Sequence, residues 1–70
     1  MSFSETLRSI RKSLNLSQQA FAKELGVSFA TINRWEGGLQ RPSPLALQAL
    51  ISYCQIKGIA APTVKNLKQQ

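Results

Sequence analysis

The stretch at residues 17–37, SQQAFAKELGVSFATINRWEG, determines the fold that we predict for this chain. Ser17 is a favourable N-cap, because its hydroxyl can accept a hydrogen bond from a backbone N–H in the first helical turn. Apolar residues then recur at helical spacing up to Gly26, and glycine ends helices well because it enters the left-handed conformation without a side-chain clash. Ser28 can cap a second helix. The stretch therefore predicts two short helices joined only by residues 26–28.

Length and composition limit what the chain can be. Its 70 residues form one small domain, and its formal net charge of +6 favours anionic partners such as nucleic acid. The sequence has no His, and Cys54 is its one cysteine, which excludes disulfide frameworks and Cys/His zinc sites within one chain. We therefore expect no metal and no cofactor. Cys54 is interpreted as an inert core thiol, since no His is present to activate it.

Membrane and enzyme functions find little support in the sequence. The N-terminus lacks a basic region followed by an apolar run, and no apolar segment has the length needed to span a bilayer. We therefore expect a cytoplasmic protein that does not associate with membranes. Three scattered Glu and no His supply no catalytic pair, so an enzyme is the weakest interpretation.

Further helices are predicted on both sides of this stretch. Residues 3–14 follow a capping-box pattern and carry one apolar stripe, made of Phe3, Leu7, Ile10 and Leu14. Ser43 caps a fourth helix, whose buried stripe is Leu47, Leu50, Ile51 and Cys54. Residues 58–70 allow two interpretations, a short fifth helix opened by Pro62 or a frayed tail. We expect an all-α, compact four- or five-helix domain, with its helix-turn-helix part in residues 1–57.

A helix, a short turn containing glycine and a second helix are the layout of the DNA-binding helix-turn-helix. One side of the second helix, residues 29–36, is apolar, while the other carries small, amide and cationic side chains. This chemistry suits a major groove, because Arg34 can donate two hydrogen bonds to guanine and Asn33 can pair with adenine. Ala30 and Phe29 can touch thymine methyl groups, although an aromatic side chain is more often part of a core.

Phosphate contacts are predicted at helix starts and in the loop after residue 36. Gln18 lies where backbone N–H groups point outward, and its amide adds a donor, so we favour a phosphate contact over a merely solvated side chain. For Gln19 we favour the solvated interpretation. Arg41 is a reasonable phosphate ligand. Arg8 and Lys12 allow both interpretations equally.

The sequence resembles the phage-repressor and Cro-like helix-turn-helix family, also called Xre-type. The resemblance is carried by Leu16-Ser17-Gln18, Phe21-Ala22, Leu25-Gly26-Val27-Ser28, Thr31-Ile32 and Trp35-Glu36-Gly37. With Pro42 and the apolar fourth helix, it covers about residues 7–54. The resemblance implies a repressor-like domain whose third helix, residues 29–36, is the recognition helix.

Position by position, the resemblance implies roles for the residues of the recognition helix. Phe29, Ala30 and Arg34 align with base-reading positions of the family, and Asn33 lies beside them. Several relatives carry polar side chains at the first two positions, whereas Phe29 and Ala30 form few hydrogen bonds. Base reading is therefore expected to rest mainly on Asn33 and Arg34.

Other positions match supporting residues of the family. Gln18 matches the position that grips phosphate, and Ser28 matches the cap of the recognition helix. Together with Arg41 they form the predicted phosphate-contacting set. Arg11 and Glu36 match a pair that forms an internal salt bridge in many members, so we give Arg11 a structural role.

The resemblance implies sequence-specific binding of double-stranded DNA, as in a small transcriptional regulator. Relatives usually bind as two-fold homodimers to half-sites of a pseudo-palindrome, about one helical turn apart. An antitoxin or a DNA-targeting partner of a modification enzyme is the near alternative. A protein-interaction module that kept the fold without DNA binding is another. Phe29 favours this module, whereas Arg34 and the positive charge argue against it.

Overall fold

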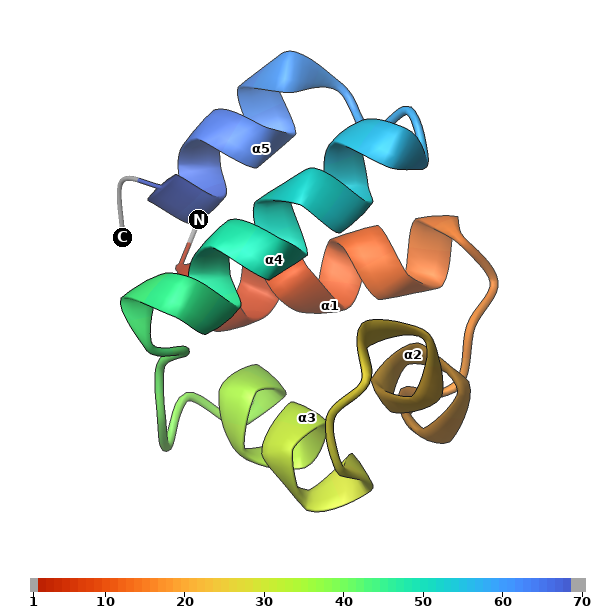
Figure 1. Cartoon of the computed structure of the whole chain (residues 1–70), viewed down its shortest axis with the longest axis vertical. Helices are drawn as coiled ribbons and strands as arrows, with labels where there is room; N and C mark the ends of the chain where they lie inside the picture. The colour runs from red at the N-terminus through yellow and green to blue at the C-terminus, as the bar shows by residue number, and fades with distance from the viewer. Residues whose placement is uncertain (1, 69–70) are drawn as a thin grey trace.

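The computed structural model describes residues 2–68, which form five α-helices (Figure 1). The helices are α1 (Phe3–Ser13), α2 (Gln18–Leu25), α3 (Phe29–Glu36), α4 (Pro44–Ile56) and α5 (Ala61–Lys68). The predicted all-α class is confirmed, and α1 ends one residue earlier than predicted because Leu14 is its C-cap. No helix between residues 2 and 68 combines the length and hydrophobicity that a membrane crossing requires.

A serine N-cap precedes each of the first four helices. The hydroxyls of Ser2, Ser17, Ser28 and Ser43 each accept a hydrogen bond from the backbone N–H three residues further on. At α1 the predicted capping box is complete, since the backbone N–H of Ser2 donates to Glu5 Oε1 at 3.0 Å. These caps satisfy N–H groups that have no partner inside a helix, which is why short-range sequence signals locate the helix starts well.

The turn between α2 and α3 depends on a left-handed glycine. Gly26 has a φ of +74°, and the N–H of Val27 after it donates to the carbonyl of Ala22 at 3.0 Å. This geometry closes the end of α2 and directs the chain away from the helix axis. Ser28 then starts α3, so the two helices pack directly against each other.

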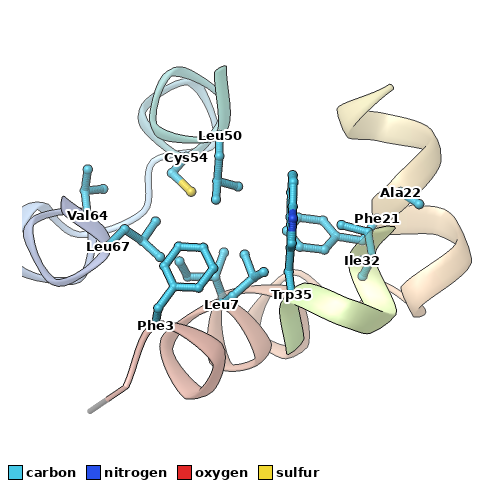
Figure 2. Packing of buried hydrophobic residues seen from close by; sticks show 11 residues of the cluster. Phe3, Leu7, Phe21, Ala22, Ile32, Trp35, Leu50, Cys54, Val64 and Leu67 are labelled. Carbon is cyan, nitrogen blue, oxygen red and sulfur yellow. The ribbon is translucent and has the colours of Figure 1, made fainter. Parts of the chain in front are cut away.

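All five helices contribute side chains to one hydrophobic core (Figure 2). The buried members are Phe3, Leu7, Ile10, Phe21, Ala22, Ile32, Trp35, Leu50, Cys54, Val64 and Leu67. Of the stripe predicted on α4, Leu50 and Cys54 are buried, while Leu47 and Ile51 are half-buried at its border. The core therefore holds α3 by its apolar side against the rest of the domain.

Residues 61–68 form a helix that joins this core. It begins at Ala61, one residue before the predicted opening at Pro62, and it packs on α1 and α4. Val64 and Leu67 are buried in the same cluster as the side chains of α1. Helix α5 thus shares the hydrophobic core of the other four helices.

The packing of α5 leads to a test of stability. Leu67 is fully buried, so Leu67→Ala should lower the free energy of unfolding by about 2–5 kcal/mol through lost burial and a cavity. Urea denaturation would measure this loss. The exposed Lys65 on the same helix provides a control, because Lys65→Ala should change stability by no more than about 0.5 kcal/mol. Equal stability of the two variants would mean that α5 is frayed in solution.

Candidate nucleic-acid interface

Helix α3 has one buried and one exposed side. Ile32, Trp35 and Glu36 are buried beneath it. The predicted base-contacting side chains Phe29, Ala30, Asn33 and Arg34 are all exposed. Phe29 retains 47% of its accessible surface, so it is not part of the core. Together with α2, α3 occupies the end of the molecule opposite α5 (Figure 1).

A buried ion pair joins α1 to the last residue of α3. Arg11 Nε donates to Glu36 Oε2 at 2.7 Å, and Arg11 Nη2 donates to Glu36 Oε1 at 3.0 Å. The Glu36 side chain is only 2% exposed and that of Arg11 is 14% exposed. Arg11 Nη1 also donates to the carbonyl of Leu16 at 2.9 Å. These hydrogen bonds to Glu36 raise the pKa of Arg11, so the guanidinium stays charged. The structure thus brings Arg11 and Glu36 together.

The same carboxylate orients two amide side chains. Gln18 Nε2 donates to Glu36 Oε1 at 3.1 Å, and Asn33 Nδ2 donates to Gln18 Oε1 at 3.3 Å. Because a carboxylate only accepts hydrogen bonds, the amide nitrogen of Gln18 faces Glu36 and its oxygen faces Asn33. An amide nitrogen carries two hydrogens, so Gln18 and Asn33 each keep one N–H for an external acceptor. The exposed Asn33 is therefore linked to the buried ion pair.

Arg8 also contacts the end of α3. Its Nη2 donates to the backbone carbonyl of Glu36 at 2.8 Å, a contact between residues 28 positions apart. A cation beside a helix C-terminus is favourable, because the last carbonyls carry partial negative charge. From the sequence, Arg8 is interpreted equally well as a solvated side chain or as a phosphate contact. No local pattern indicates its contact with the Glu36 carbonyl.

The predicted phosphate-contacting residues lie in different surroundings. Gln18 and Ser28 are at the starts of α2 and α3, where the Ser28 hydroxyl accepts from the N–H of Thr31 at 3.1 Å. Arg41 follows α3 in the loop, and its guanidinium carbon lies 4.9 Å from the centre of the Phe3 ring. Arg41 therefore packs against α1 as a cation–π partner of Phe3, whereas Gln18 and Ser28 lie at helix starts.

A loop side chain that the sequence did not single out contacts Arg34. Arg34 Nε donates to Gln40 Oε1 at 2.9 Å, and both residues are exposed. The contact spans the end of α3, so neither helical periodicity nor a motif could have identified it. It makes Gln40 a further member of the candidate interface.

The remaining reactive group is buried away from this surface. Cys54 is fully buried in the core, and burial raises the pKa of its thiol to about 11, which keeps it protonated near neutral pH. Among residues 2–68, Cys54 and the Glu side chains form no cluster of three or more that could hold a metal ion.

Comparison with protein families assigns the fold. The family model described as helix-turn-helix matches residues 7–57. The chain belongs to this Xre/Cro-like helix-turn-helix family. The match contains α2, α3 and α4 with most of α1, and it ends before α5. Helix-turn-helix proteins of this family are DNA-binding and not normally enzymatic. Comparisons with curated proteins and with solved structures give no match.

The buried ion pair leads to a second test of stability. Arg11→Ala leaves the Glu36 carboxylate buried without its charged partner, which should cost about 3–5 kcal/mol of the free energy of unfolding. Thermal and urea denaturation would measure the loss. Lys12→Ala is the matched control, because it removes a neighbouring exposed charge and should leave stability nearly unchanged. Unaltered thermal stability of Arg11→Ala would refute the structural role of this pair.

Proposed function

We propose that this chain binds double-stranded DNA sequence-specifically and acts as a small transcriptional regulator, with α3 in the major groove. The observation that carries the proposal is the exposed face of α3, where Asn33 and Arg34 lie beside Phe29 and Ala30. The helix-turn-helix family match agrees with this assignment. A regulator of this kind would act in the cytoplasm, where it meets DNA.

The side chains of this face determine which bases it would read. Arg34 would donate two hydrogen bonds to O6 and N7 of a guanine. Asn33 would donate its remaining N–H to N7 of an adenine and accept from the N6 amino group. Phe29 and Ala30 would contact thymine methyl groups, because they present only apolar surface. Two polar readers per protomer favour a short half-site.

Phosphate contacts would fix the depth and direction of α3 in the groove. Gln18 and Ser28 lie at helix starts, where partial positive charge and outward N–H groups attract phosphate. Arg41, in the loop after α3 and against Phe3 of α1, would supply a full positive charge, and the net charge of +6 adds long-range attraction. This part of the affinity should weaken steeply as salt rises, because each neutralised phosphate releases counterions.

Two copies would bind one site. A pair of protomers related by a two-fold axis would place two α3 helices in successive major grooves, about 34 Å apart. The site would then be a pseudo-palindrome. Such a dimer doubles the number of bases read, which compensates for the small number of polar readers on one α3.

The exposed Phe29 supports one alternative function. A half-exposed aromatic ring on an otherwise small and polar surface is also a suitable anchor for another protein. In that alternative α3 would contact a protein partner, and Arg34, its one basic residue, would lie at the rim of the contact. Binding to DNA at low salt distinguishes the two functions.

Selection of bound duplexes from a random pool would test base reading by α3. The wild-type chain should enrich a pseudo-palindromic motif, and Arg34→Ala should lose preference at one guanine per half-site, by about 5- to 150-fold. Lys65→Ala removes an equal charge from α5 and should keep the motif. Binding without any enriched motif would contradict sequence specificity. Failure to bind DNA at low salt would favour the protein-interaction function.

A further inference from the structure

We propose that Gln40 is a positioning residue for Arg34, one that selects which edge of the guanidinium faces the base. The proposal rests on the proposed function, since it concerns how one of its readers is oriented. Through Gln40, the loop after α3 would contribute to sequence discrimination.

The end of α3 places Gln40 beside Arg34. The N–H of Leu39 donates to the carbonyl of Arg34 at 3.0 Å, and the N–H of Gly38 donates to the carbonyl of Trp35 at 3.3 Å. Gly38 has a φ of +76°, the left-handed conformation that such a helix end requires. The chain therefore turns back at Gly38, and the side chain of Gln40 returns to the level of Arg34.

The hydrogen bond between these side chains occupies one edge of the guanidinium. A guanidinium can form paired hydrogen bonds from its side, through Nε and one Nη, or from its end, through both Nη atoms. Gln40 Oε1 accepts the Nε–H at 2.9 Å, so the side edge is engaged. Within residues 2–68, no protein group accepts a hydrogen bond from Nη1 or Nη2 of Arg34. The end edge is therefore the one available to O6 and N7 of guanine.

A neutral amide suits this task better than a carboxylate. An Asp or Glu at this position would hold Arg34 but would also neutralise its charge, which weakens its attraction to DNA. Gln40 orients the guanidinium and leaves the charge intact. The acidic residue nearest to Arg34 in sequence, Glu36, is occupied by Arg11 and Gln18 on the buried side of α3. Orientation before binding reduces the ordering that Arg34 undergoes on contact with the base.

A double-mutant cycle on DNA discrimination would test this role. Affinity is measured for two duplexes, the selected one and the same duplex with one guanine replaced. That guanine is the one at which Arg34→Ala loses preference. The four proteins compared are the wild type, Gln40→Leu, Arg34→Ala and the double variant. Gln40→Leu should reduce discrimination at that base pair about five-fold, the typical effect of one side-chain hydrogen bond. Affinity for an unrelated duplex should not change. In the Arg34→Ala background, Gln40→Leu should have no further effect.

Two further variants complete the design. Gln40→Glu keeps an acceptor for the Nε–H and should retain more discrimination than Gln40→Leu, even where its charge lowers overall affinity. Gln48→Leu makes the same substitution at an exposed glutamine of α4 and should leave discrimination unchanged. Thermal unfolding of each variant verifies that the fold is intact.

The outcomes separate this proposal from the function on which it rests. If Gln40→Leu weakens all duplexes equally, or acts as strongly without Arg34, Gln40 contacts DNA directly and the positioning role is overturned. If Arg34→Ala loses discrimination and Gln40→Leu keeps it, only the positioning role fails. If the wild type enriches no motif, or if Arg34→Ala keeps full discrimination, base reading by Arg34 and its positioning by Gln40 both fail.

Discussion

The ion pair between Arg11 and Glu36 is the interaction on which the placement of α3 depends. Burying two charges is costly, and it is tolerated only when their hydrogen bonds are satisfied. Here the two side chains bond each other twice, Arg11 also bonds the carbonyl of Leu16, and Glu36 accepts from Gln18. Since Glu36 is the last residue of α3, this network ties the helix to α1 and to the start of α2.

The two side chains of α3 that we propose to read bases each donate a hydrogen bond to an amide from another segment. Asn33 donates to Gln18 at the start of α2, and Arg34 donates to Gln40 in the following loop. The direction of the first contact follows from Glu36, because its carboxylate sets the orientation of Gln18. If α3 binds DNA as proposed, this surface would be oriented before it meets DNA. Side chains held by such supporting contacts lose less freedom on binding, which favours discrimination.

Local rules account for what the sequence predicted well. Serine caps, Gly26 and apolar residues at helical spacing act within a few residues, so they located the first four helices and the turn. Segment 61–68 remained ambiguous because an isolated short helix is marginal, and its stability comes from burying Val64 and Leu67 against α1 and α4. Contacts between distant side chains carry no such local signal. Gln40 with Arg34 and Arg8 with the Glu36 carbonyl are of this kind, while the pairing of Arg11 with Glu36 was expected only from the family resemblance.

Amide spectra of the ¹⁵N-labelled chain, titrated with a random-sequence duplex at low salt, would test most directly whether α3 faces DNA. We expect the largest shifts at backbone amides 28–34, at the side-chain amides of Gln18 and Asn33, and at the Nε–H of Arg34. The amides of α5, at the opposite end of the molecule, should stay unchanged (Figure 1). Shifts centred on α4 and α5, or no shifts at all, would contradict the assignment of α3 as the DNA-binding face.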